Sequence, residues 1–196
     1  QAETVLAIMP PLLVDQWAEW LSKIKRKDSK QLTIHKYAGP PAARKKINFK
    51  ADFLLSGVQL FKQNINRFVD ELGGNDIHVI LDEAQCIKNV DSENYRVYRD
   101  FVEFNTHQLL TGTPLNVPVD AYAYIKLVSP GTYRNLLHFS NAHVTEIDIF
   151  NKPTKYKDLD ILTENLLINA VRKTKEDVLK DLPECVVSTV EYSLDP

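Results

Sequence analysis

A short apolar run that ends in two adjacent carboxylates places the strongest limit on the fold of this chain. Residues 77–81 (IHVIL) form the run, and Asp82 and Glu83 follow it directly. Such a run is typical of a strand buried on both faces of a parallel sheet. Two adjacent acids are costly to bury, so we expect them at the open carboxyl edge of the sheet. There one carboxylate can hold a magnesium ion and the other a water molecule; the alternative is a strand that ends in a solvated acidic turn.

The segments around this run alternate between predicted strands and predicted helices. Apolar runs at residues 4–9, 51–56 and 107–110 predict further buried strands, and alternation over residues 34–37 predicts another. Crossover connections between parallel strands are right-handed. This βαβ rhythm therefore implies an α/β fold, with a parallel sheet that carries helices on both faces.

Two of the predicted helices contribute to the expected core. Trp17 and Trp20 recur with other apolar residues at helical spacing, and we expect both tryptophans to be buried. A second helix is predicted after Val58, and Gly73-Gly74 ends it. Its apolar face is expected to consist of Phe61, Ile65, Phe68, Val69 and Leu72.

Composition excludes several classes of protein. No apolar run is long enough to span a membrane, and the first residues do not form a signal peptide. Cys86 and Cys185 make neither a disulfide framework nor a metal site, which fits a reducing compartment. Because the net charge is −2, a nucleic-acid surface must be a local basic patch. The densest cluster is Arg44, Lys45 and Lys46; the alternative interpretation is a solvated helix face.

Two motifs, in this order, resemble those of a known ATPase family. Residues 82–89 (DEAQCIKN) are similar to motif II of superfamily-two helicases, and more closely to the DEAx-x-IKN form of Swi/Snf-type ATPases, which are DNA translocases. Residues 109–116 (LLTGTPLN) are similar to the family's LTGTPLNN, with Val117 replacing the last Asn. The chain is identified as a member of this family. Most members have His where this chain has Gln85, and the DEAQ form resembles bacterial and viral members, so we expect such a source.

Shorter segments extend the resemblance over nearly the whole chain. The proline turn and helix after residue 9 resemble motif Ia, which is matched by Pro10, Leu13, Gln16 and Trp17. Leu12 stands where the family usually has a capping Ser, so one donor to a helix start or phosphate is lost.

The resemblance continues to the end of the sequence. Ser56 matches motif Ib, where a small hydroxyl contacts a DNA phosphate, although Gly57-Val58 departs from the usual Ser/Thr-Tyr. Residues 171–183 are similar to the family's LRRTKEDVLKDLP segment, with Lys173 replacing one of the paired arginines.

The family fold implied by these motifs is a RecA-like first motor lobe with a small helical protrusion. We expect residues 1–115 to form part of the lobe, residues 116–170 the protrusion, and residues 171–196 the end of the lobe. The aromatic-rich stretch over residues 139–150 has little clear period, and alternation predicts a last strand over residues 185–194.

The resemblance also implies roles for individual residues. Asp82 would bind magnesium through water, and Glu83 would position and deprotonate the attacking water. Gln85 would relay the nucleotide state to a second RecA-like lobe, with Arg172 also acting between the lobes. Hydrolysis would be coupled to DNA contacts by a loop whose hydroxyls bond to the Asp82 and Glu83 carboxylates: Thr111, Gly112 and Thr113.

The implied cofactors are ATP and Mg²⁺, and the implied partners are double-stranded DNA and the second lobe. The residues expected to contact DNA come from motifs Ia and Ib and from the basic cluster: Pro10, Gln16, Ser56, Arg44, Lys45 and Lys46. No membrane partner is expected. The expected location is the cytoplasm of a bacterium or of a virus-infected host cell, with the nucleus as the alternative.

None of the six glycines is followed by the Lys-Ser/Thr of a phosphate-binding loop. In the family that loop precedes motif Ia, so we expect an interior piece of the lobe that alone neither binds nor hydrolyses ATP appreciably. Two alternatives stay open. One is an RNA helicase or restriction-type motor of the same superfamily, and the other is a non-catalytic RecA-like module that binds DNA or protein.

Overall fold

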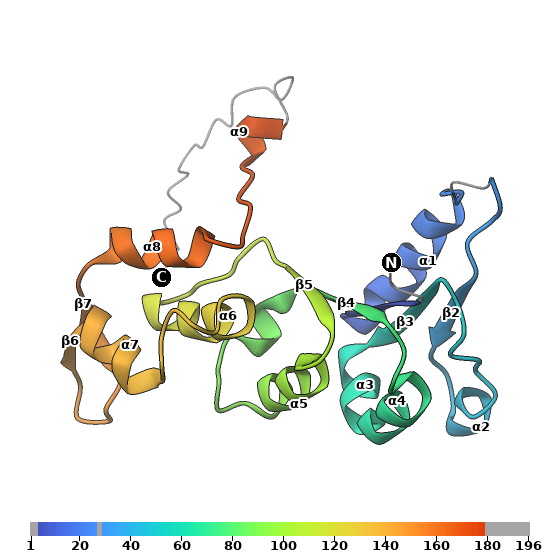
Figure 1. The fold of residues 1–196 in the computed structure, drawn as a ribbon, viewed down its shortest axis with the longest axis horizontal. Coiled ribbons are helices and arrows are strands. Elements are labelled where there is room, and N and C mark those ends of the chain that lie inside the picture. The colour runs from blue at the N-terminus through green and yellow to red at the C-terminus, as the bar shows by residue number, and fades with distance from the viewer. Residues whose placement is uncertain (1–3, 27–28, 179–196) are drawn as a thin grey trace, which may run out of the picture.

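The computed structural model describes residues 4–26 and 29–178 and has a five-stranded sheet (Figure 1). The strands stand in the order β2-β3-β1-β4-β5, and every neighbouring pair is parallel. Their bounds are Thr4–Met9 (β1), Ile34–Tyr37 (β2), Phe53–Gly57 (β3), Ile77–Asp82 (β4) and Thr106–Leu110 (β5). The predicted α/β fold with a parallel sheet is confirmed.

Helices lie on both faces of this sheet. The helix α1 covers one face, and α3, α4 and α5 cover the other (Figure 1). The short helix α2 follows β2, at the edge of the sheet. The helix bounds are Val14–Ser22 (α1), Pro41–Arg44 (α2), Val58–Gln63 (α3), Ile65–Leu72 (α4) and Glu93–Val102 (α5).

The larger core lies beneath α3, α4 and α5 and has an aromatic centre. The ring of the fully buried Phe68 contacts those of Tyr37, Phe49 and Phe61, at centroid distances of 4.8, 5.2 and 5.1 Å. Phe61 in turn contacts Phe101 of α5 at 5.1 Å. These edge-on contacts join β2, the α3–α4 pair and α5 into one core.

β4 is a central strand, between β1 and β5, but its two faces are buried unequally. Ile77, Val79 and Leu81 are buried beneath the helices, whereas His78 and Ile80 on the opposite face are half-buried. The prediction of full burial on both faces is therefore wrong for one face. The reason is that, among the described residues, a single helix of nine residues covers that face.

The single helix predicted before Gly73-Gly74 is broken into α3 and α4 at Asn64. Asn64 has φ −121° and ψ 25°, outside the helical region, and its side-chain Nδ2 donates to the carbonyl of Leu60 at 2.8 Å. That bond satisfies a carbonyl at the end of α3. Val69, expected on the buried face, is 50% exposed, so this part of the prediction is wrong.

Only one of the two tryptophans on α1 lies near the core. The helix buries Val14 and Leu21 and half-buries Trp17 and Ala18, a stripe with helical spacing. Trp20 lies beside that stripe and is 53% exposed, so its predicted burial is wrong.

The chain after β5 forms a second, smaller core. The helices α6, α7 and α8 meet around Phe139 and Leu162. An antiparallel hairpin, which the sequence did not predict, follows α7. α6 also packs against the larger core through Ala123 and Tyr124. The bounds are Ala121–Val128 (α6), Leu136–His143 (α7), Val144–Ile147 (β6), Pro153–Tyr156 (β7), Leu159–Leu167 (α8) and Lys175–Val178 (α9).

The strand predicted over residues 185–194 lies outside the described residues. None of the helices in the described part of the chain is both long and apolar enough to cross a membrane.

Candidate active site

The carboxyl edge of the parallel sheet gathers the residues of the predicted site. Asp82 is the last residue of β4 and Glu83 follows it, while Thr111 comes directly after β5. Strand register places Asp82 beside Leu110, so the two strands end together. Pro10 follows β1, the neighbour of β4 on its other side. Carboxyl ends of parallel strands are where open α/β sheets bind ligands.

Asp82 is held by two hydrogen bonds, one of them from a residue that the sequence assigned only to the core. The indole Nε1 of Trp17 donates to Asp82 Oδ2 at 3.0 Å, and the backbone N–H of Glu83 donates to Oδ1 at 2.9 Å. Trp17 is half-buried. The motif Ia match was the one signal that could have pointed to it. Its side chain fixes one oxygen of the Asp82 carboxylate.

Glu83 has a backbone conformation that few side-chain-bearing residues adopt. Its φ of 53° and ψ of 53° lie in the left-handed region. A non-glycine residue held there is strained, and such strain is concentrated at functional sites. The next residues form the short 3-10 helix η2 (Ala84–Ile87), whose Ala84 and Ile87 are buried. The hydroxyl of Tyr124 on α6 donates to the carbonyl of Ala84 at 3.4 Å.

Gln85 connects the carboxylate to the loop after β5. Its Nε2 donates to Glu83 Oε2 at 2.7 Å, and its Oε1 accepts from Thr111 Oγ1 at 2.9 Å. Reversing the amide would turn its oxygen toward the carboxylate, so only this orientation satisfies both bonds. The prediction that the threonine hydroxyls bond directly to the carboxylates is therefore wrong for Thr111. Its link to Glu83 runs through Gln85.

The rest of the loop is open to solvent. The backbone N–H of Thr113 donates to Thr111 Oγ1 at 3.1 Å, and both Gly112 and Thr113 are exposed. Gly112 does not have a positive φ, and a Cβ built on it would meet no atom within 4 Å. The described fold itself does not require a glycine at this position.

The two carboxylates fit a magnesium ion that keeps much of its water. Among residues 4–26 and 29–178, no three His, Cys, Asp or Glu side chains gather as a metal site. Mg²⁺ is usually held by one or two carboxylates together with waters and substrate phosphates. Each oxygen of Asp82 accepts one hydrogen bond and keeps a lone pair toward such waters.

Cys86 lies inside the motif but is not a reactive thiol. Burial raises the pKa of the Cys86 thiol to about 11. The thiolate is the nucleophilic form, so this cysteine stays neutral and inert near pH 7.

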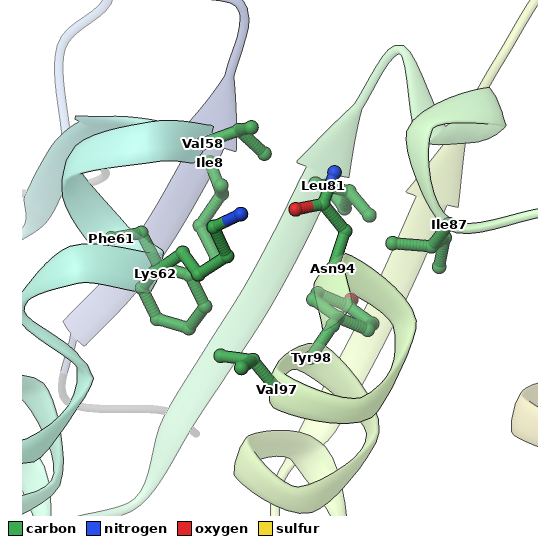
Figure 2. Close-up of a pocket in the computed structure, with 9 residues that line it drawn as sticks. All are labelled: Ile8, Val58, Phe61, Lys62, Leu81, Ile87, Asn94, Val97 and Tyr98. Carbon is green, nitrogen blue, oxygen red and sulfur yellow. The ribbon is translucent and has the colours of Figure 1, made fainter. Parts of the chain in front are cut away.

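A small cavity lies beneath the site, between α3, α5 and the strands β1 and β4 (Figure 2). Its volume is about 10 Å³, which is near the size of one water. The Tyr98 hydroxyl on its wall is buried and has no hydrogen-bond partner, and burial raises the pKa of this group. Lys62 and Glu93 form an ion pair between α3 and α5, at 2.8 Å. This cavity is too small for a substrate.

The residues predicted to contact nucleic acid are not equally accessible. Ser56 is fully buried and its hydroxyl donates to the carbonyl of Gly57 at 3.2 Å, so it does not reach a phosphate in this structure. Pro10 is half-buried, and Gln16 is exposed on α1.

In the basic cluster, one side chain packs against the protein and the other two face solvent. The guanidinium of Arg44 lies 5.9 Å from the centroid of the Tyr37 ring, and the residue is half-buried. Lys45 and Lys46 are exposed. The guanidinium of Arg67 on α4 donates to the carbonyls of Arg44 and Lys45, at 2.7 and 3.2 Å. The backbone of the cluster is therefore fixed while its two lysine side chains face solvent.

Arg172 is exposed in the segment before α9. Hydrogen bonds from Thr174 lower the pKa of the Asp177 carboxyl, and the charge of Arg172 lowers it further. The described structure brings Arg172 to none of the residues at the sheet edge.

The fold and this site together define a class. A five-stranded parallel sheet with helices on both faces, whose central strand ends in Asp82, is an α/β fold of the RecA-like type. The chain belongs to the SNF2-related domain family, which it matches over residues 1–196.

Known proteins with similar sequences include members from eukaryotes and bacteria. The chain is 24% identical over 194 residues to the TATA-binding protein-associated factor mot1 of Schizosaccharomyces pombe, covering 93% of this chain and 10% of that protein. It is 31% identical over 120 residues to an uncharacterized ATP-dependent helicase of Mycoplasma pneumoniae, covering 61% of this chain and 11% of that protein. The chain thus spans about a tenth of the length of these relatives. A bacterial or viral source stays a prediction.

A solved structure shares the fold. It is the Sulfolobus solfataricus SWI2/SNF2 ATPase core in complex with dsDNA, at 21% identity and a TM-score of 0.68. The match covers 93% of this chain and 36% of that chain.

Proposed function

We propose that this chain is part of the motor of a DNA-dependent ATPase, which hydrolyses ATP with Mg²⁺ and moves on duplex DNA. The observation that carries the proposal is the hydrogen-bonded series from Glu83 through Gln85 to Thr111, beside an Asp82 fixed by Trp17. The names of similar proteins support it, since they include an ATP-dependent helicase and an ATPase core solved with dsDNA.

The proposed chemistry follows from the free atoms of the two carboxylates. Asp82 would hold Mg²⁺ through water, and the bound ion would neutralise charge that develops on the transferred phosphate. Glu83 Oε2 already accepts from Gln85, and no described residue donates to Oε1. Oε1 is therefore the atom that would accept the proton of the attacking water.

The proposed coupling runs along the edge of the sheet. Gln85 offers one donor to Glu83 and one acceptor to Thr111, so a shift of the loop after β5 changes the position of the carboxylate. The exposed loop of Gly112 and Thr113 would contact DNA or the second RecA-like lobe, as would Arg172. Since the described fold does not need glycine at 112, we attribute the glycine to the close approach of such a partner.

The Trp17→Phe variant tests the fixed position of Asp82. Phenylalanine keeps an aromatic ring in the half-buried position but removes the Nε1–H donor. A hydrogen bond to a charged group contributes roughly 1.5–3 kcal/mol, so we expect ATP turnover of the full-length protein to fall about tenfold or more. Trp20→Phe, on the exposed side of the same helix, is the matched control and should keep full turnover. Equal rates for both variants would show that Trp17 only packs.

The experiment that tests the proposed function combines ATP hydrolysis with DNA binding. We expect the full-length protein to hydrolyse ATP in a Mg²⁺-dependent reaction that duplex DNA stimulates. The Lys45→Ala/Lys46→Ala variant should need more DNA for the same stimulation, while its DNA-free turnover stays unchanged. Each lost phosphate contact should lower the slope of log affinity against log salt by roughly one unit, similarly for unrelated sequences.

The two lysines are chosen because their side chains are exposed, whereas Arg44 packs on Tyr37. An Arg44→Ala variant, assayed for unfolding, separates a packing defect from lost DNA binding. A salt slope equal to that of the wild type would identify Lys45 and Lys46 as a solvated surface. A protein without Mg²⁺-dependent ATP hydrolysis, with or without DNA, would contradict the proposed function itself.

A further inference from the structure

A second, larger hollow lies at the amino edge of the sheet, away from the candidate active site. Its volume is about 600 Å³, in the range of ligand-binding clefts. It begins beside Ile77, the first residue of β4, whereas Asp82 is the last residue of that strand. At the rise of a strand the two sites lie roughly 17 Å apart. We call this hollow the amino-edge groove. It lies between the ends of α4 and α5 and is lined by residues of the segments 69–77 and 100–105.

The amino-edge groove has an apolar floor and an exposed apolar wall. Leu72, Ile77 and Phe101 are buried and form the floor. On the wall, Val69 is 50% exposed and Phe104 is 89% exposed. A phenylalanine this open beside a hollow leaves apolar surface in water, and such surface marks interaction sites.

Acidic side chains outnumber basic ones around the groove. Residues 69–77 and 100–105 contain five acidic side chains and no Lys or Arg, although the whole chain has 24 basic and 26 acidic residues. The five are Asp70, Glu71, Asp76, Asp100 and Glu103. Glu71 pairs with Arg67 of the same helix at 3.6 Å, and Asp100 pairs with Arg99 of the same helix at 2.6 Å. All five remain exposed to solvent.

We propose that the amino-edge groove binds a segment of another polypeptide, one that presents a bulky apolar side chain flanked by lysines or arginines. The apolar side chain would enter the hollow against Phe101 and Phe104, and the basic side chains would meet the acids around it. Charge of this sign repels nucleic acid and attracts a basic partner. Because the groove is at the opposite edge from Asp82, such a partner leaves the candidate active site open.

The test uses the full-length protein and a short fluorescent peptide in which leucines and one tryptophan are interspersed with lysines. We expect saturable binding by fluorescence anisotropy, weakened by salt. A peptide with glutamate in place of lysine, and one with serine in place of the apolar residues, should bind at least about tenfold more weakly. Absence of saturable binding of the basic peptide, or equal binding of all three, would overturn the proposal.

Variants locate the binding site. Phe104→Ala should weaken binding of the basic peptide about tenfold, and Asp70→Asn/Glu103→Gln should weaken it and flatten its salt dependence. Phe150→Ala is the matched control, because Phe150 is 73% exposed at the turn between β6 and β7. An equal loss in Phe150→Ala, or no loss in Phe104→Ala, would contradict the assignment. A change from dimer to monomer in Phe104→Ala, seen by light scattering, would show that a second copy fills the groove and would also overturn the proposal.

Discussion

Replacing Glu83 with glutamine is expected to reduce ATP turnover of the full-length protein by about 10²–10⁴-fold, the range of general base catalysis. Glutamine has the same shape, and its carbonyl can still accept the hydrogen bond from Gln85 Nε2. An amide, however, cannot take a proton from the attacking water. The loss should therefore fall on kcat, because the carboxylate acts in the transition state and not on the bound nucleotide.

The measurement is phosphate release under saturating ATP, with nucleotide affinity determined separately by equilibrium binding. Nucleotide affinity should stay within about twofold of the wild type, since Glu83 is not expected to contribute to binding of the nucleotide in the ground state. Glu164→Gln is the matched control, because Glu164 is an exposed residue of α8. Undiminished turnover of the Glu83→Gln variant would show that another group is the base. A large loss of nucleotide affinity would show that Glu83 instead contributes to binding of the nucleotide in the ground state.

Removing the ring of Phe68 is expected to have the largest effect on stability. Phe68 is fully buried and its ring contacts three others, those of Tyr37, Phe49 and Phe61. A Phe→Ala change at such a site costs about 3–5 kcal/mol, because the transfer free energy of the ring is lost and a cavity remains. Total stability of a domain is roughly 5–15 kcal/mol, so the change removes between about a fifth and all of it.

Urea unfolding followed by tryptophan fluorescence measures this change, since Trp17 and Trp20 both lie on α1. Phe104→Ala removes the same ring from an 89% exposed position and should change the free energy of unfolding by less than about 0.5 kcal/mol. A cost below about 1 kcal/mol for Phe68→Ala would mean that the four rings are not the centre of the core. Both variants remove the same phenyl ring, one from a buried position and one from an exposed position. The difference between their free energies of unfolding therefore measures the effect of burial.

The candidate active site is tied to α6 as well as to the sheet. Tyr124 of α6 donates to the carbonyl of Ala84, and Lys88 forms an ion pair with Asp120 at 3.5 Å. These contacts hold both ends of η2, which carries Gln85, against the start of α6. A shift of α6 and a shift of the Thr111 loop would therefore both act on η2. The predicted boundary at residue 115 stays a prediction.

The sequence alone determined the elements whose burial pattern is local. The apolar runs at residues 4–9 and 77–81 became β1 and β4. A strand or helix shows its period within a few residues, so neighbours in space are not needed to recognise it. For the same reason, the sequence alone was enough to predict that Asp82 and Glu83 lie at a strand end, where the parallel sheet has its open edge.

Tertiary structure decided what each side chain meets. Trp17 reaches Asp82 across 65 residues of sequence, Thr111 reaches Glu83 only through Gln85, and Ser56 is buried at the strand end where an exposed hydroxyl was expected. Period and spacing specify which face of an element is apolar, but not how much of that face its neighbours cover. That is why Trp20, at helical spacing with Trp17, remains in solvent while Trp17 becomes part of the site.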